Sequence, residues 1–180
     1  MHDNGPMTEA TPRPPQRRYW FVIALAVFVV IADQLSKVWA EAALGGGEVI
    51  PVIGDFIRFV LVYNTGAAFG LGTGYTWVLA LVAGVAAVAI AWYGWRVRSW
   101  WWAVVFGLVL GGAITHFGDR VFRGKVVDFI GYGNFFIGNV ADIAIVGGAI
   151  LGGVLALMQV PIRGKAVPAE AAEAAERPEA

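Results

Sequence analysis

Four long runs of apolar residues constrain this chain more than any other feature of its sequence. They cover about residues 19–44, 75–95, 100–117 and 140–160. A helix needs roughly 17–25 mostly apolar residues to cross the hydrocarbon core of a bilayer. Hydrophobic residues make up 58% of the chain and charged residues 14%, whereas a soluble domain has about 45–50% and about 25%. The sequence therefore predicts an integral membrane protein, mainly α-helical, with four transmembrane helices.

The flanks of these runs predict a single membrane domain with polar ends. Residues 1–18 are rich in proline and arginine, and residues 166–180 are low-complexity Ala, Glu and Pro. We expect a disordered basic arm over residues 1–18, a membrane domain over 19–160 and a disordered tail over 161–180. The first apolar run is predicted to be a retained span, because no small-residue cleavage site follows it directly.

Basic residues predict which ends of the spans face the cytoplasm, where short loops are enriched in Lys and Arg. Such residues precede the first span, join the second span to the third and follow the fourth: Arg13, Arg17, Arg18, Arg96, Arg98, Arg163 and Lys165. We therefore expect both termini in the cytoplasm and residues 45–74 and 118–139 on the outer face. Arg120, Arg123 and Lys125 in the second outer segment are a local exception to this pattern.

The first outer segment predicts a small extracytoplasmic β-sheet. Residues 48–63 are rich in β-branched and aromatic side chains and contain a Gly-Asp turn signal, which predicts strands over about 49–53 and 56–63. Open sheet edges do not occur in lipid, so we expect this sheet to rest on the membrane surface as a cradle within residues 45–74. Residues 64–70 are expected to form a short interfacial helix or turn.

Composition excludes several kinds of site. The chain has no cysteine, which excludes disulfides and thiolate chemistry, and its net charge of zero gives no electrostatic case for nucleic acid. Its histidines, His2 and His116, do not form a zinc-protease motif. Ser36 lies in the first span and Ser99 on the predicted cytoplasmic side, so neither suits a Ser-His-Asp triad with His116.

The first span contains ionisable residues. Asp33 and Lys37 are four residues apart, about one helical turn, so that they can pair. Ionisable groups at membrane depth cost about 2.5–3.5 kcal/mol each on insertion scales and are functional-site hypotheses by default. We interpret the pair as an element that positions the site. The ordinary alternative is that both residues lie near the outer end of the helix and hold a loop.

Three aspartates near the last two spans differ in their neighbours. Asp119 is followed by Arg120, and a nearby cation favours an ionised carboxyl, so these two are predicted to form a structural ion pair. Asp128 is flanked by apolar residues on both sides, so burial is expected to raise its pKa. Asn139 suits a helix N-cap, which places Asp142 at position N3, where the helix dipole favours a carboxylate.

One acid shifted toward its neutral form and one held ionised is the division of roles that an aspartyl hydrolase requires. We therefore hypothesise that Asp128 and Asp142 meet at the membrane surface, where the ionised acid activates water and the protonated acid polarises a peptide carbonyl. We expect the glycine-bearing segment 131–138 to be a loop, short enough to bring them together. The ordinary alternative stays open, in which Asp142 caps a helix and Asp128 pairs with Arg123 or Lys125.

Five short motifs over about residues 19–160 are specific when taken in sequence. They are Asp-Gln-Leu-Ser-Lys at 33–37, Asn-Thr-Gly-Ala-Ala-Phe at 64–69, Gly-Gly-Ala at 111–113 leading to Asp-Arg at 119–120, Val-Val-Asp-Phe at 126–129, and Asn-Val-Ala-Asp at 139–142. In this order the chain resembles lipoprotein signal peptidase (signal peptidase II). The resemblance implies a bacterial inner-membrane aspartyl endopeptidase with its active site at the extracytoplasmic face.

An enzyme of this kind would remove signal peptides from prolipoproteins by cutting on the N-terminal side of the diacylglyceryl-modified cysteine. The family's catalytic pair falls on Asp128 and Asp142. Residues expected to bind substrate or shape the site are Asp33, Lys37, Asn64, Gly66, Phe69, His116, Arg120 and Asn139. The resemblance implies a diacylated prolipoprotein and membrane lipids as partners. For the proposed mechanism we expect no metal and no cofactor, and we also expect no nucleic acid and a monomer.

The chain departs from the family pattern at two places. Thr115 and His116 stand where the family has Gly-Asn, and Gly138 stands where it has Phe. His116 precedes Asp119 by three residues, so its charge is expected to couple to the site at about pH 6.5. The ordinary alternative is a histidine satisfied by water or backbone.

Two other functions stay open as alternatives. One is a scaffold of the same fold that binds lipoprotein precursors without cutting them. The other is a proton-coupled membrane carrier, which predicts carboxylates spread through the depth of the membrane. The expected clustering of Asp119, Asp128 and Asp142 on one face disfavours the carrier.

Overall fold

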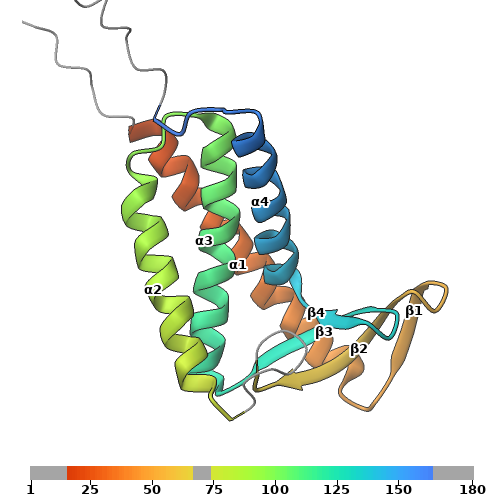
Figure 1. Ribbon diagram of the computed structural model, residues 1–180. Helices are drawn as coiled ribbons and strands as arrows, with labels where there is room; N and C mark the ends of the chain where they lie inside the picture. The colour runs from red at the N-terminus through yellow and green to blue at the C-terminus, as the bar shows by residue number, and fades with distance from the viewer. Residues whose placement is uncertain (1–15, 67–73, 164–180) are drawn as a thin grey trace, which may run out of the picture.

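The computed structural model describes residues 16–66 and 74–163, and within these ranges the chain forms a bundle of four helices with a small sheet at one end (Figure 1). Helices α1 (Gln16–Leu44) and α3 (Trp100–Arg123) run toward the sheet. Helices α2 (Thr76–Gly94) and α4 (Val140–Leu157) run back from it. The start of α1, the α2–α3 connection and the end of α4 therefore lie at the end of the bundle far from the sheet.

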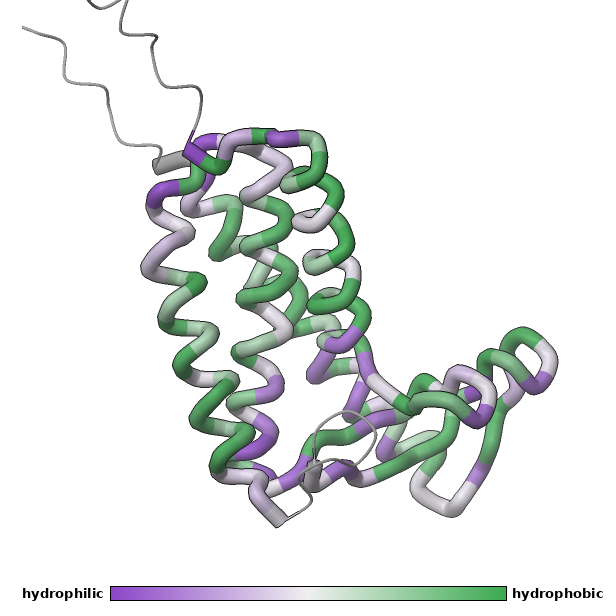
Figure 2. Tube along the Cα trace, in the orientation of Figure 1, coloured by the Kyte–Doolittle hydropathy of each residue, from purple (hydrophilic) through white to green (hydrophobic). Residues whose placement is uncertain are grey.

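The bundle exposes apolar side chains on its outer surface. Hydrophobic residues follow the helices along most of their length (Figure 2), and Val88 and Leu157 are 71% and 86% exposed. Large exposed apolar surfaces of this kind mark contact with a membrane or a partner. In the described part of the chain, four helices are long and apolar enough to cross a membrane. This confirms the predicted fold, mainly α-helical with four spans.

Helix α3 is the central helix and packs against α1, α2 and α4. Glycines permit its close contacts: a Cβ at Gly111 would lie 2.6 Å from Val29 on α1, and one at Gly112 would lie 2.5 Å from Ile145 on α4. Small residues at such crossings let helix backbones approach each other in a membrane. The resulting contact of α1, α3 and α4 carries the candidate site.

The sheet has four antiparallel strands among the described residues, in the order β1-β2-β3-β4. They span Val49–Ile53, Ile57–Asn64, Val126–Tyr132 and Phe136–Gly138. The first two confirm the predicted strands to within one residue. The segment 131–138, predicted as a loop, instead contains the end of β3 and all of β4. The local pattern missed this because β3 is stabilised by pairing with β2, a segment far away in the sequence.

Helix α3 continues beyond its predicted end at residue 117, to Arg123. The helix persists because Asp119 is buried against α1, where it finds a charged partner. Gly124 ends the helix in the left-handed conformation, with a φ of 68°. Asp119 and Arg120 therefore belong to α3 and not to an outer loop.

The end of the bundle opposite the sheet carries basic residues beside aromatic rings. The guanidinium of Arg96 lies 4.1 Å from the centroid of the Trp92 ring. The amide of Arg98 donates to the carbonyl of Ile162 and so joins the α2–α3 connection to the segment after α4. The predicted basic segments thus share one end of the bundle, and the side of the membrane on which they lie stays a prediction.

Several predictions concern residues outside the described ranges. The basic arm and the C-terminal tail fall largely on residues 1–15 and 164–180, and most of the interfacial helix falls on 67–73, with Phe69 among them. These assignments stay predictions. The described ranges contain the other predicted site residues.

Gly112→Ala should destabilise the protein, because the new Cβ would lie 2.5 Å from Ile145 and 2.9 Å from the carbonyl oxygen of Ala141. Overpacking a tight contact costs about 1–3 kcal/mol, so the thermal unfolding temperature in detergent should fall. Gly153→Ala is the matched control, since nothing lies within 4 Å of a Cβ at that position. Equal unfolding temperatures for the two variants would contradict the close contact of α3 with α4.

Candidate active site

A buried lysine lies between two buried carboxylates where α1 meets α3. The Nζ atom of Lys37 is 2.6 Å from Oδ2 of Asp33 and 2.5 Å from Oδ2 of Asp119. Gln34 donates to both carboxylates, at 3.3 Å and 3.0 Å. Burying a charge costs several kcal/mol, which only close pairing and hydrogen bonding offset. We refer to Asp33, Gln34, Lys37 and Asp119 as the buried cluster.

The buried cluster confirms the predicted pairing of Asp33 with Lys37 and corrects the predicted partner of Asp119. Asp119 pairs with Lys37 rather than with Arg120. Consecutive residues on a helix do not face the same way, so Asp119 faces α1 while Arg120 faces the site. Arg120 donates to the carbonyls of His116, at 3.3 Å, and Gly66, at 3.0 Å.

The buried cluster also holds the start of α4. Oδ1 of Asp33 accepts a 2.9 Å hydrogen bond from the amide of Ala141, one of the amides that the first turn of a helix leaves without a partner. Asn139 caps the same turn, since its side-chain oxygen accepts from the amide of Asp142 at 3.1 Å. In return Oδ2 of Asp142 accepts from the amide of Asn139 at 2.8 Å. This capping box confirms the predicted N-cap and N3 positions.

Asp128 is buried on β3 and is held by two amide side chains. Its Oδ2 accepts from Nδ2 of Asn64 at 2.9 Å, and its Oδ1 accepts from Nδ2 of Asn139 at 2.7 Å. Burial raises the pKa of Asp128 from its ordinary value to about 6, and the charge of Asp142 also raises it. The hydrogen bonds and the charge of His116 act in the opposite direction. The rise in the pKa of Asp128 that its apolar neighbours predicted is confirmed.

The basic residues near β3 have other partners than Asp128. Nη1 of Arg123 lies 3.5 Å from Oε2 of Glu41, and Nζ of Lys125 lies 3.4 Å from the centroid of the Tyr63 ring. The alternative in which Asp128 pairs with Arg123 or Lys125 is therefore wrong. The second half of that alternative is correct, since Asp142 does cap a helix.

Asn139 links the two candidate acids. Its side-chain nitrogen binds Asp128, while its side-chain oxygen and its amide bind Asp142. The other oxygen of Asp142 lies 3.2 Å from Nε2 of His116. A quarter (25%) of the Asp142 side chain is exposed, whereas Asp128 is buried. Asp128 and Asp142, the predicted pair, are thus linked through Asn139, and their side chains lie in different environments.

The end of β2 is tied to the site from its other side. Besides donating to Asp128, Asn64 accepts a 2.8 Å hydrogen bond from the amide of Gly66 through Oδ1. The carbonyl of Gly66 in turn accepts from Arg120 on α3. These bonds place the predicted site residues Asn64, Gly66 and Arg120 around one edge of Asp128.

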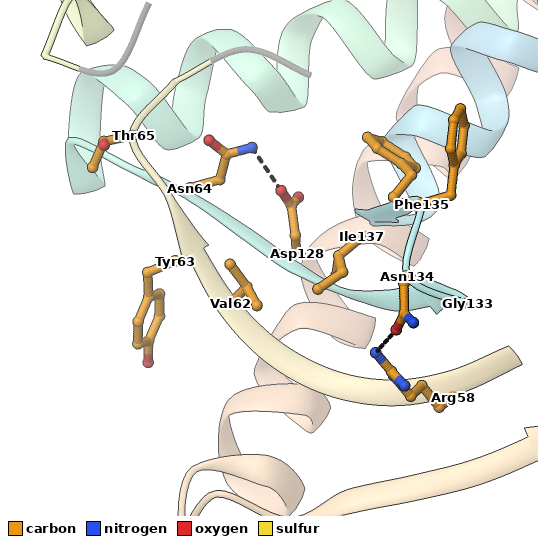
Figure 3. Close-up of a pocket in the computed structure, with 11 residues that line it drawn as sticks. Arg58, Val62, Tyr63, Asn64, Thr65, Asp128, Gly133, Asn134, Phe135 and Ile137 are labelled. Carbon is orange, nitrogen blue, oxygen red and sulfur yellow. Dashed lines mark hydrogen bonds between the residues drawn. The ribbon is translucent and has the colours of Figure 1, made fainter. Parts of the chain in front are cut away.

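Asp128 points into a cleft of about 600 Å³ between β2 and the β3–β4 turn (Figure 3). The lining includes both polar side chains, such as Asn64 and Asn134, and apolar ones, such as Val62. Arg58 of β2 donates to Asn134 of the turn at 3.3 Å. The cleft therefore offers hydrogen-bonding groups beside the buried acid.

Asp142 borders a second, largely apolar groove of about 560 Å³ beside α4. Its other lining residues are Phe56, Tyr132, Phe135, Phe136, Ile143, Val146, Gly147 and Ile150. Phe135 and Phe136 line both the cleft and the groove. The acids thus lie between a partly polar cleft in the sheet and an apolar groove on a membrane helix.

In the part of the chain that the structure describes, no group of three or more His, Asp or Glu residues is placed to hold a metal ion. Nitrogen donors instead surround the carboxylates. Lys37 binds Asp33 and Asp119, and Asn139 binds Asp128 and Asp142.

Sequence reasoning missed Gln34 and the two phenylalanines that separate the cleft from the groove. Gln34 could have been identified from the sequence, because it is an amide side chain beside Asp33 within an apolar run. No local sequence pattern indicates where Phe135 and Phe136 lie, because their position follows from the β3–β4 turn at Gly133, whose φ is 55°. A local pattern does not reveal which cavity a turn will line.

The chain is similar to known proteins over most of its length. The family described as signal peptidase (SPase) II matches residues 25–158. A lipoprotein signal peptidase of Mycobacterium avium is 46% identical over 150 residues, which are 80% of this chain and 82% of that protein. One of Rhodococcus jostii is 42% identical over 164 residues, which are 87% and 83%.

Two solved structures described as bacterial membrane enzymes share the fold. The first has a TM-score of 0.69 and 29% identity, and covers 81% of this chain and 93% of its own. The second has a TM-score of 0.66 and 32% identity, and covers 78% of this chain and 94% of its own. The comparison of folds is therefore consistent with the comparison of sequences.

Lys37→Met should destabilise the protein strongly, because it leaves Asp33 and Asp119 buried without their shared cation. Removing one partner of a buried ion pair costs about 3–5 kcal/mol, which thermal unfolding in detergent will report. Arg123→Met is the matched control, since its ion pair with Glu41 is partly exposed and such pairs contribute about 0–1 kcal/mol. If both variants unfold at the same temperature, the buried cluster does not hold α1 against α3.

Proposed function

The chain belongs to the signal peptidase II family, and we propose that it removes signal peptides from bacterial prolipoproteins with Asp128 and Asp142 as its catalytic pair. The observation that carries this proposal is the link through Asn139 between a buried carboxyl and a partly exposed one. Membership of the family supports a peptidase that acts on lipoprotein precursors. The geometry of the two acids supports the aspartic type.

In the proposed mechanism a water molecule reacts between the two carboxyls. Asp142, as the carboxylate of the pair, takes a proton from the water while the water oxygen bonds to the carbonyl carbon of the scissile peptide. Asp128, protonated, gives its proton to the carbonyl oxygen. The C–N bond then breaks as Asp142 passes its proton to the leaving nitrogen. The hydroxyl proton of the intermediate returns to Asp128, which restores both acids.

Burial supports the role of Asp128 as the acid, since it raises the pKa of this carboxyl to about 6. The protonated form is lost as the pH rises through this value. Peptide that enters the cleft removes water from around Asp128, and such desolvation raises the pKa of a carboxyl further. The bound substrate thus favours the protonation state that the mechanism needs.

The two hollows beside the acids suit a substrate that is part peptide and part lipid. The cleft around Asp128 offers Arg58 and Asn134 to an extended peptide. The groove around Asp142 is apolar and runs beside a membrane helix, where an acyl chain stays out of water. A diacylglyceryl-modified cysteine joins both kinds of group, so we place the cut on its N-terminal side.

The remaining site residues act by holding the two acids. Asn64 and Asn139 bind Asp128. Arg120 ties the end of β2 to α3 through Gly66. The buried cluster fixes the start of α4 through Asp33. We assign these residues to positioning rather than to proton transfer.

We place this site at the extracytoplasmic face of the cell membrane, with both chain termini in the cytoplasm. The arrangement of the basic segments supports this orientation, because residues 96–98 and 163 lie at the end of the bundle far from the acids. Both acids come from one chain, so a monomer suffices for the mechanism. Water and side chains supply its proton transfers.

A scaffold that binds precursors without cutting is the second candidate function. It is favoured by the two departures from the family pattern, because both lie against Asp142. His116 is 3.2 Å from Oδ1 of Asp142, and a Cβ at Gly138 would lie 2.8 Å from its Oδ2. A proton carrier is disfavoured, since hydrogen bonds gather the carboxylates near the sheet end of the bundle.

Asp128→Asn and Asp142→Asn should each reduce cleavage of a diacylated prolipoprotein by at least about 10²-fold, because each removes a proton-transfer group. Product formation by the purified protein in lipid measures this. Asp55→Asn, in the exposed β1–β2 turn, is the matched control and should cleave like the parent. Unchanged cleavage by either dyad variant would exclude the mechanism, while a parent that binds precursor without cleaving it would establish the scaffold.

The diacylated precursor should be cleaved at least about tenfold faster than its unlipidated form, because each buried methylene contributes about 0.8 kcal/mol. Initial rates at substrate concentrations below saturation measure the difference. The control is a soluble peptide unrelated in sequence, which should not be cut. Equal rates for the two precursors would show that the groove beside α4 does not hold an acyl chain.

A further inference from the structure

His116 lies beside the oxygen of Asp142 that the capping box does not use. Asn139 donates to Oδ2 of Asp142, and Nε2 of His116 lies 3.2 Å from Oδ1. The imidazole comes from α3, whereas Asp142 begins α4, so this contact joins two helices at the site. Both side chains are partly exposed, 15% of His116 and 25% of Asp142.

The contact determines which nitrogen of His116 carries the proton. An ionised carboxylate only accepts hydrogen bonds, so Nε2 must be the donor. Nδ1 is buried and has no hydrogen-bond partner among the described residues. The neutral imidazole with its proton on Nε2 satisfies this arrangement. A second proton would add attraction to Asp142 and would also bury an N–H without an acceptor.

Several charged or titratable groups surround the imidazole of His116. The elements packed around it contribute titratable or charged groups as follows: Asp142 from α4, Asp128 and Tyr132 from β3, Arg120 and Asp119 from α3 itself, and Asp33 and Lys37 from α1. Asp33 and Asp119 are paired with Lys37. The unpaired negative charge near the imidazole therefore belongs to the dyad.

We propose that His116 is a positioning residue for Asp142, and that its positive charge, when present, acts on both acids of the dyad. This inference rests on the proposed function of Asp128 and Asp142. Through Nε2–H, His116 holds Oδ1 of Asp142 while Asn139 holds Oδ2. The carboxylate is thereby fixed against the buried acid. An Asn side chain at this position would supply a hydrogen-bond donor but no titratable charge.

The sign of the effect follows from the charge of the imidazolium. A positive charge beside two carboxyls favours their ionised forms, so it moves the pH range of the singly protonated dyad downward. The charge of His116 indeed acts against the raised pKa of Asp128. Replacing His116 with an uncharged donor removes this attraction. The pH–rate profile must then move upward.

His116→Asn tests the proposal, with cleavage of a diacylated precursor measured across pH 4.5–9 as the readout. Its pH–rate profile should move to higher pH by roughly half a unit or more. His116→Leu should show the same movement and also lose rate at its own optimum, by about tenfold or more, because it lacks the donor as well. Phe122→Leu, which is exposed on the same helix, is the matched control and should keep the parental profile.

A parental profile in both His116 variants would overturn the proposal, even if their rates fall, because a purely structural role changes rate without moving the pH optimum. His116→Asn carries the test alone if His116→Leu does not fold, since Asn keeps a polar hydrogen-bond donor beside Asp142. Failure of this inference differs from failure of the proposed function. The proposed function fails if Asp128→Asn or Asp142→Asn still cleaves the precursor, whatever the pH–rate profiles of the His116 variants.

Discussion

The first turn of α4 is the constraint on which the site depends. Its amides and its cap bind groups from distant parts of the chain: Asp33 of α1 accepts from Ala141, and Asn139 binds Asp128 of β3. The same cap holds Asp142. A helix that began one residue earlier or later would break these bonds together, because each needs a particular amide or side chain at a fixed position. The spacing of Asn-Val-Ala-Asp therefore encodes both a helix start and the geometry of two acids.

Charge fixes the register of the helices that carry this turn. Apolar side chains gain little by leaving lipid for another helix, since lipid is equally apolar, so apolar surfaces alone specify poorly how α1 lies against α3. A buried Lys37 that must meet Asp119 permits few registers. Because Lys37 also binds Asp33, the same interaction aligns the acceptor for the start of α4. The costly burial of charge thus specifies where the site forms.

The features that could be predicted from the sequence are those that residues close together in the chain determine. The spans, the first two strands, the pairing of Asp33 with Lys37 and the capping box of Asn139 and Asp142 all depend on segments of a few residues or on one helix. Contacts between distant segments were missed or wrong. Asp119 has a neighbouring cation in sequence but pairs with Lys37 of another helix, and β3 forms because it pairs with the distant strand β2. Local patterns reveal that a group needs a partner, while the fold decides which partner it finds.

The difference in protonation between the two acids is the central claim, and infrared spectroscopy of the carboxyl groups in the purified protein tests it most directly. The C=O stretch of a protonated carboxylic acid should be present at pH 5 and disappear with a midpoint near pH 6, since the pKa of Asp128 is raised to about 6. This band should be absent from Asp128→Asn and present in Asp55→Asn. Loss of the band with a midpoint near that of an ordinary aspartate, about pH 4, or its survival in Asp128→Asn, would contradict the claim.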